Sequence, residues 1–167
     1  EMGEKDYDLL KRLTIAGPEH RKWNRMVTVT MDITAPLYWW KEYDTYKVAT
    51  VANSCSTMHK IQAKEFTLDD FSHENLTCLS LQVLDDITRV LNHYRDEFNE
   101  TKGKKDWWQM IQLLPTSYNQ KRTVHLNYET LGAMYRQRKY HKLYEWKRFC
   151  VEIEGLPYSD FITMKFE

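Results

Sequence analysis

The sequence is poor in the residues that mark several large classes of protein. It contains 3 Cys, 5 Gly and 4 Pro among 167 residues. Three widely spaced cysteines do not form the dense, even set of a disulfide framework, and no Gly/Ser/Pro linker divides the chain. No apolar run approaches the roughly 20 residues that span a bilayer. The first six residues also lack the apolar stretch of a signal peptide. We therefore expect a cytoplasmic protein without a membrane partner.

The motifs of several enzyme classes are missing as well. There is no Gly-x-Ser-x-Gly elbow, no Gly-rich phosphate loop and no dinucleotide fingerprint. The 6 His are scattered, and the nearest pair of metal-ligand types, Cys55 with His59, lacks two further ligands at zinc spacing. We therefore expect no metal site.

The chain is rich in apolar and aromatic residues, which make up 42% and 14% of it. This content supplies a hydrophobic core and excludes a disordered chain. The length matches one domain of ordinary size, so we expect a single domain over residues 1–167.

The formal net charge of zero hides four blocks of charge. Residues 1–64 carry 10 basic and 8 acidic groups, residues 65–100 carry 2 and 9, residues 101–148 carry 11 and 3, and residues 149–167 carry 1 and 4. The net charges are thus +2, −7, +8 and −3. Two interpretations remain open: helices of opposite charge that pair with each other or across an oligomer, or a basic site for an anionic ligand.

The hydrophobic pattern predicts an α+β domain in which helix dominates. The alternation in residues 26–33 predicts a strand, and because a lone strand is unstable, a small antiparallel or mixed sheet must include others. Apolar residues at three- and four-residue intervals predict two long helices. The remaining expectations are a short helix at 8–13, long helices at 74–98 and 128–152, a helix start at Thr67, a short helix at 106–114, an extended segment at 123–126, and a helical or irregular segment at 37–46.

Two segments carry candidate chemistry. Residues 53–59 gather small polar groups suited to binding an anion or a base edge, with Cys55 a possible nucleophile; the alternative is a polar turn or a Ser/Thr-rich helix cap. On the second long helix, Arg138, His141, Glu145 and Arg148 share one face. This face suggests a phosphate or carboxylate clamp centred on Arg138, or a solvated, salt-bridged surface.

Basic residues with interleaved aromatics over residues 107–148 also allow a grip on nucleic acid. No nucleic-acid-binding module is present and the chain is neutral. We therefore do not expect a nucleic-acid partner.

Several weak segments, taken in order, resemble the flavin-dependent thymidylate synthases, which are tetrameric α+β enzymes that use FAD. The likeness covers roughly residues 9–150. The matching segments are residues 9–17 with their terminal Gly17, the strand ending at Ala35 and Pro36, the aromatic residues 37–39, the Leu-Pro segment 113–115, Asn127, Leu131 and Arg138.

The signature of that family is altered in this chain. The family has Arg-His-Arg, two residues, Ser, one residue, Asn-Glu, one residue, Ser, and the corresponding region here is residues 45–56. Lys47, Thr50, Asn53 and Ser56 resemble its members. Thr45 and Tyr46 stand in place of the first Arg and His, Ser54 in place of the acid, and Glu129 in place of a flavin-binding Arg.

The resemblance implies specific roles for residues of this chain. Ser56 is the implied catalytic residue and also binds the nucleotide, together with Ser54, Glu42 and Arg138. The implied cofactor-binding residues are Lys47, Asn53, Asn127 and His141. The implied reaction methylates a dUMP-like pyrimidine deoxynucleotide with a folate one-carbon unit and reduced flavin, with NADPH as a further possible co-substrate, in a homotetramer.

Two alternatives remain open. One is a non-catalytic nucleotide-binding or interaction protein that kept the fold, because three residues of the signature are replaced. The other is an enzyme that modifies a different pyrimidine nucleotide, for which Cys55 is the residue to test.

Overall fold

The computed structural model describes residues 2–54 and 56–164, which form two compact units. The first unit contains residues 1–32, 42–52 and 123–167, and the second contains residues 33–41 and 53–122. Each unit therefore combines segments that are distant in sequence. The expectation of a single domain stays a prediction.

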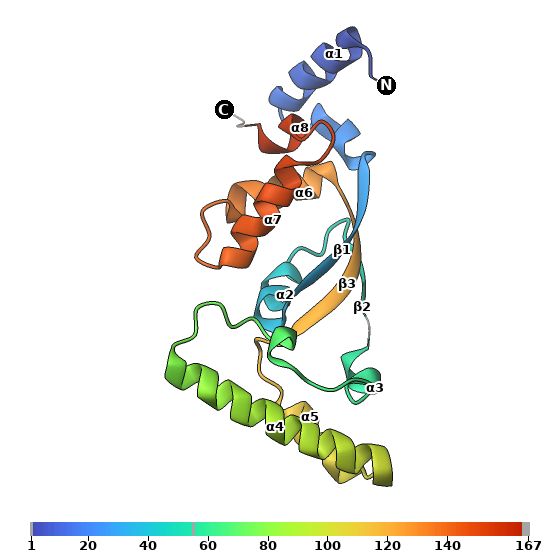
Figure 1. The fold of residues 1–167 in the computed structure, drawn as a ribbon. Coiled ribbons are helices and arrows are strands. Elements are labelled where there is room, and N and C mark those ends of the chain that lie inside the picture. The colour runs from blue at the N-terminus through green and yellow to red at the C-terminus, as the bar shows by residue number, and fades with distance from the viewer. Residues whose placement is uncertain (1, 55, 165–167) are drawn as a thin grey trace. The chain divides into compact units, whose positions relative to one another are not determined.

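The sheet has three strands in the order β1-β3-β2, namely β1 (Thr28–Pro36), β2 (Val51–Ser54) and β3 (Asn119–Asn127). In the first unit, Tyr128 N–H donates to the carbonyl of Val27 and Thr30 Oγ1 contacts His125 Nδ1 at 2.8 Å. In the second unit, Leu37 N–H donates to the carbonyl of Tyr118. These contacts make β1 and β3 antiparallel, so the predicted strand and small sheet are confirmed (Figure 1).

The helices of the first unit pack mainly against one another. They are α1 (Glu4–Ile15), the 3-10 helix η1 (Arg21–Arg25), α6 (Tyr128–Arg138), α7 (Tyr144–Glu154) and α8 (Asp160–Thr163). Helix α6 packs against α7, α8 and η1, and α1 packs against η1. Gly17 ends α1 with a φ of 119°, in the region that favours glycine. The side chains of Leu131, Met134, Trp146 and Ile162 are fully buried and form part of the core of this unit.

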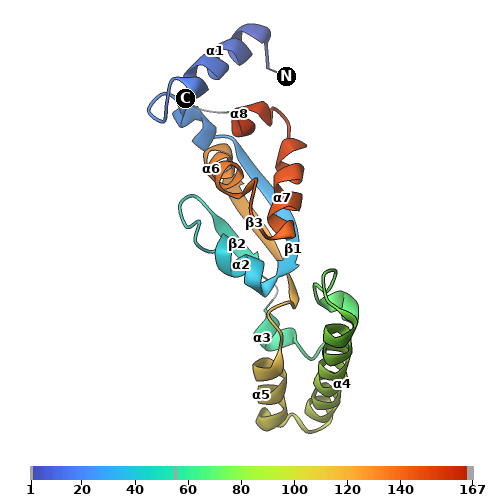
Figure 2. The ribbon, with the colours of Figure 1, turned by 90° about the vertical axis from the view of Figure 1, so that its left-hand side faces the viewer.

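The second unit contains the helical hairpin of α4 (Cys78–Thr101) and α5 (Lys104–Leu113), which run side by side (Figure 2). It also contains α3 (Thr57–Lys60) and the 3-10 helix η2 (Leu68–Asp70). Phe66, Phe71, Leu84, Leu91 and Met110 are buried together in its core. The helix α2 (Leu37–Tyr43) begins in this unit and ends in the first.

The predicted helix at 74–98 is confirmed by α4, but a single helix over residues 128–152 is wrong. The chain leaves the helix after Arg138 and resumes at Tyr144. Residues 138 and 146 would lie about 12 Å apart along one straight helix, yet both contact a single oxygen of Glu42. The break therefore brings together two side chains that a continuous helix would separate.

Other expectations differ in detail. The helix start at Thr67 is confirmed, but it opens only the short η2, where Thr67 and Asp70 form a capping box. The open choice for residues 37–46 resolves to α2, followed by turns. None of the described helices combines the length and apolarity needed to cross a bilayer.

Candidate functional site

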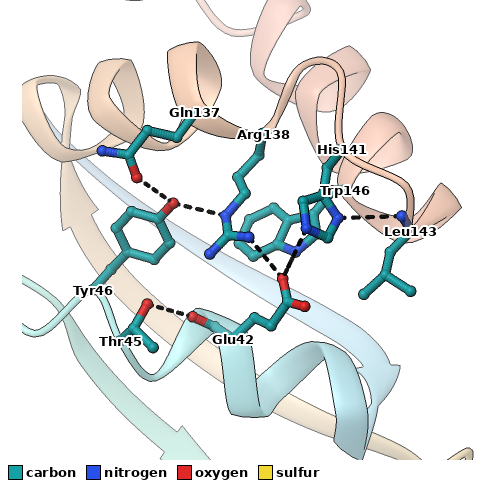
Figure 3. A network of polar contacts seen from close by, with 8 residues as sticks. All are labelled: Glu42, Thr45, Tyr46, Gln137, Arg138, His141, Leu143 and Trp146. Carbon is teal, nitrogen blue, oxygen red and sulfur yellow. Dashed lines mark hydrogen bonds and ion pairs between the residues drawn. The ribbon is translucent and has the colours of Figure 1, made fainter.

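A half-buried carboxylate organises a cluster of polar side chains in the first unit (Figure 3). Glu42 Oε2 accepts a hydrogen bond from Arg138 Nη1 at 2.8 Å and another from Trp146 Nε1 at 2.9 Å. His141 Nε2 lies 3.4 Å from the same oxygen. We call Glu42, Tyr46, Arg138, His141 and Trp146 the Glu42 cluster. One carboxylate oxygen thus joins α2 to α6 and α7.

Arg138 is held on several sides within this cluster. Its Nε donates to Tyr46 Oη at 2.8 Å, and the Tyr46 hydroxyl donates to Gln137 Oε1 at 2.8 Å. Its guanidinium carbon lies 4.8 Å from the centroid of the Trp146 ring, a cation-π distance. Among the described residues, only Nη2 of this guanidinium has no assigned acceptor. Arg138, which is predicted to bind a phosphate, is therefore already paired with a carboxylate.

A hydrogen bond from a nearby backbone N–H orients the ring of His141. Its Nδ1 accepts the N–H of Leu143 at 3.2 Å, so the proton of a neutral imidazole belongs on Nε2, facing Glu42. Both ring nitrogens are therefore engaged. Four residues are predicted to share one helical face. Two of them, Arg138 and His141, meet at Glu42, whereas Arg148 is exposed on α7, after the helix has been interrupted.

Asn127 has a local structural role. Its side chain accepts the N–H of Thr130 at 3.0 Å and so caps the N-terminus of α6, and the residue is buried. Two residues later, Glu129 forms an ion pair with Arg21, with Nε 2.9 Å from Oε2. Burial, and then the nearby Arg21, lower the pKa of Arg136, while Glu129 raises it.

A second candidate site is a cavity of about 260 Å³ in the second unit, which we call the lysine cavity. Lys60, Lys64 and Lys121 line it together with two carboxylates, Glu65 and Asp70. Lys64 Nζ lies 2.6 Å from Asp70 Oδ1, and this hydrogen bond raises the pKa of Lys64. The lining therefore has a net charge of +1, which favours an anionic ligand.

Ser56, the predicted catalytic residue, lines the lysine cavity. Its Oγ accepts the N–H of His59 at 3.3 Å as the N-cap of α3, so its hydroxyl proton stays available to an acceptor. No described imidazole or carboxylate accepts a hydrogen bond from this hydroxyl, so its geometry suits binding better than nucleophilic attack. Asn53 and Ser54 are exposed on β2. Cys55 lies outside the described residues.

The wall of the lysine cavity is braced by Gln120. Its Nε2 donates to Thr57 Oγ1 at 2.7 Å, its Oε1 accepts from Arg122 Nε at 2.8 Å, and its carbonyl accepts from Trp40 Nε1 at 2.9 Å. Such connected hydrogen bonds fix side chains before a ligand arrives.

The site residues implied by the resemblance do not include Lys60, Lys64, Lys121 or Trp146. The first two stand four residues apart just after Ser56, a spacing that could have indicated one cationic face. No local signal marks Lys121 or Trp146, because each reaches its site through the tertiary fold.

A smaller cavity of about 210 Å³ lies in the first unit and is lined by Lys47, Tyr46 and Thr50, among others. Lys47 is exposed there. Within the part of the chain that the structure describes, no three His, Cys, Asp or Glu side chains converge as metal ligands do.

The arrangement of helices and strands places this chain in a known class of fold. It is the helix-dominated α+β fold of the flavin-dependent thymidylate synthases, with a small antiparallel sheet. Two crystal structures of ThyX from Helicobacter pylori, each complexed with FAD and dUMP, match it with TM-scores of 0.68 and 0.69. Each match covers 95% of this chain and 81% of the other at 16% sequence identity, a likeness of fold alone. No protein-family model and no curated protein sequence matches the chain.

An FAD diphosphate requires cations or free hydrogen-bond donors around it. Lys47 offers an exposed cation and Asn53 an exposed amide. Asn127 and His141 are already hydrogen-bonded, and Glu129 adds negative charge where the resemblance calls for an Arg. Of the residues predicted to bind the cofactor, Lys47 is therefore the one exposed cation that could bind an FAD diphosphate.

Proposed function

We propose that the chain binds a pyrimidine deoxynucleotide such as dUMP in the lysine cavity. The observation that carries this proposal is that Ser56, the residue resembling the nucleotide-binding Ser of the family, lines a cavity with three lysines. The fold likeness to structures complexed with dUMP supports it.

The chemistry of the cavity suits a nucleoside monophosphate. A phosphate near neutral pH carries between one and two negative charges, which Lys60 and Lys121 complement from α3 and β3. The Ser56 hydroxyl adds a donor, and Tyr118 and Phe66 add aromatic surface for the base or sugar. The volume of about 260 Å³ lies just below the ~300 Å³ at which the range for small-molecule sites begins.

The test is calorimetric titration of dUMP into the wild-type chain and two variants. Lys60→Ala removes an exposed lining cation and is expected to weaken binding about tenfold. Lys105→Ala removes another exposed lysine, which lies outside this cavity, and is expected to change affinity by less than about twofold. A protein that binds no pyrimidine nucleotide contradicts the proposal.

Methylation of the nucleotide with a folate one-carbon unit and reduced flavin is the second candidate function. The structures of this fold that hold both FAD and dUMP favour it, whereas Glu129, in the place of a flavin-binding Arg, opposes it. The two candidates differ in a simple observation. Yellow protein and rescue of a thymidine-requiring strain indicate the flavin-dependent reaction, and a colourless protein that binds dUMP without turnover indicates a binding protein.

The resemblance also implies a role for Arg138. Arg138 would bind a phosphate through Nη2, the donor left over from its contacts with Glu42 and Tyr46. The homotetramer is testable by light scattering of the purified protein.

A further inference from the structure

The turn between α6 and α7 and the outer side of α7 form a surface that the proposed function does not use. Tyr140 is 88% exposed and Tyr144 is 59% exposed. Lys142, Lys147 and Arg148, which stand close to them in the sequence, are exposed as well. We call these five residues the basic-aromatic face. It lies in the first unit, whereas the lysine cavity lies in the second.

The local structure gathers these residues on one side of α7. Tyr144, Lys147 and Arg148 stand three and four residues apart on this helix, so their side chains share one face. The buried residues of α7 occupy the opposite face and pack in the core. Tyr140 and Lys142 lie in the turn that leads into the helix. The face is therefore a continuous part of the surface of the first unit.

The cations of this face are not neutralised within the fold. Residues 136–148 carry 6 basic groups and 1 acidic group, a net charge of +5. The side chains of Lys142, Lys147 and Arg148 form no hydrogen bond or ion pair with another described residue. Glu152 stands four residues after Arg148, a spacing at which helical ion pairs form, yet these two described side chains are not paired. Three unpaired positive charges close together favour a polyanion as the ligand.

The two exposed tyrosines narrow the kind of polyanion. Proteins that bind single-stranded nucleic acid combine cations, which contact phosphates, with exposed aromatic rings, on which bases stack. An acidic peptide would use the cations but has no bases to stack. Tyr135 and Trp146 belong to the same stretch of basic and aromatic residues, but both are buried. The sequence alone favours no nucleic-acid partner, because it contains no known module and does not show which rings are exposed.

We propose that the basic-aromatic face binds single-stranded nucleic acid. Lys142, Lys147 and Arg148 contact phosphates, and bases stack on the rings of Tyr140 and Tyr144. These contacts involve the backbone and the flat faces of the bases, and they leave the base edges unread. The face therefore binds strands of different sequence with similar affinity.

The test measures the fluorescence anisotropy of a labelled strand of about 12 deoxyadenylates mixed with the full chain, a length within the site sizes of known single-strand binders. A purine strand is chosen because it offers no pyrimidine to the lysine cavity. Raising monovalent salt from about 50 mM to about 200 mM is expected to weaken binding about 20-fold, since each of three phosphate contacts adds about −0.7 to the slope of log K against log salt. Absence of binding at about 50 mM salt overturns the proposal.

A pair of double variants tests the cations. Lys147→Ala with Arg148→Ala removes two of the three, so affinity at about 50 mM salt is expected to fall about tenfold and the salt slope to shrink to about −0.7. Lys104→Ala with Lys105→Ala is the matched control, because it removes two exposed lysines from the second unit. Its effect is expected to stay below about twofold. Equal losses in the two double variants would mean that binding follows net charge alone, which overturns the proposal.

Two variants of Tyr140 test the stacking. Tyr140→Ala removes the ring, so affinity is expected to fall about fivefold with the salt slope unchanged. Tyr140→Phe keeps the ring and is expected to bind within about twofold of the wild type. Because the side chain is 88% exposed, neither change is expected to alter the Tm. Unchanged affinity in Tyr140→Ala overturns the proposal, and so does polyglutamate that competes as strongly as an unlabelled strand.

The outcome is independent of the proposed function. Binding of dUMP in the lysine cavity responds to Lys60→Ala, whereas the strand is expected to bind this variant as it binds the wild type. Excess dUMP is likewise expected to leave the strand bound. Displacement of the strand by dUMP, together with weaker binding in Lys60→Ala, would place the strand in the lysine cavity. That result overturns this inference while the proposed function stands.

Discussion

The Glu42 cluster and the lysine cavity both contain cationic side chains, but these differ in exposure and in the number of their partners. The Arg138 side chain is 18% exposed and contacts a carboxylate, a phenol and an indole. The Lys64 side chain is 71% exposed and forms one ion pair, with Asp70. A cation with several partners in a fixed geometry stabilises the fold, whereas an exposed cation remains able to respond to a ligand. Partners, more than residue type, therefore distinguish a structural cation from a binding one.

The largest expected effect concerns Glu42. Glu42→Ala leaves the Arg138 guanidinium and the Trp146 N–H without their shared acceptor, so we expect the free energy of unfolding to fall by about 2 to 3 kcal/mol. Urea unfolding measures this loss. Asp86→Ala on α4, where the carboxylate is 63% exposed and pairs with Arg89, is the control and should cost less than about 0.5 kcal/mol. Equal losses would remove the distinction between the two regions.

Much of the fold was accessible from local pattern. The spacing of apolar residues in α4 and the alternation in β1 were read correctly because each depends on a single buried face. The break between α6 and α7 was missed because no Gly or Pro marks it. It accompanies a tertiary contact, the convergence of Arg138 and Trp146 on Glu42, which periodicity within one segment cannot reveal.

The candidate site was accessible only in part. Arg138 and Ser56 were singled out through the family resemblance, and the structure places them in different clusters with different partners. The described ion pairs of α4 join Arg89 to Asp85 and Asp86, and Arg95 to Asp96, within that helix, so none of them pairs the −7 block with the +8 block; pairing across an oligomer stays a prediction. Summed charge over a block does not specify which side chains meet.

Alkaline pH should weaken the first unit through Cys150, which lies one turn beyond Trp146 on α7. Burial raises the pKa of its thiol to about 11, against an ordinary value of about 8.5. The folded state then keeps a proton that the unfolded state loses, so stability present below about pH 8.5 declines as the pH rises toward 11.

The measurement compares the wild-type chain with Cys150→Ala by urea unfolding at about pH 8 and about pH 10.5. The wild type should lose about 2 kcal/mol more than the variant over this interval. Tyrosine titration affects both proteins alike and cancels. Identical losses would show that the thiol beside the Glu42 cluster is not protected by burial.

A smaller effect is expected from Arg138→Lys. Lysine keeps the charge near Glu42 but loses the planar contact with Trp146 and the Nε donor to Tyr46, so stability should fall by about 1 kcal/mol. Arg89→Lys on α4, where the side chain is 71% exposed, is the matched control and should change little. Thermal unfolding of both variants measures the loss of stability. If the two substitutions lower stability equally, charge alone accounts for the role of Arg138.

The smallest expected effect concerns the Lys64–Asp70 pair of the lysine cavity. The hydrogen bond to Asp70 raises the pKa of Lys64, so the stabilisation is complete below the unfolded pKa of about 10.4 and is lost as the pH rises through the higher folded value. Because Lys64 is so exposed, solvent screening limits the contribution to a few tenths of a kcal/mol. Lys64→Met should therefore cost that amount at about pH 8 and nothing near pH 12, whereas Lys60→Met should be neutral at both. A loss above about 1 kcal/mol would mean that the pair stabilises the cavity as Glu42 stabilises its cluster, and that exposure alone does not separate the two kinds of cation.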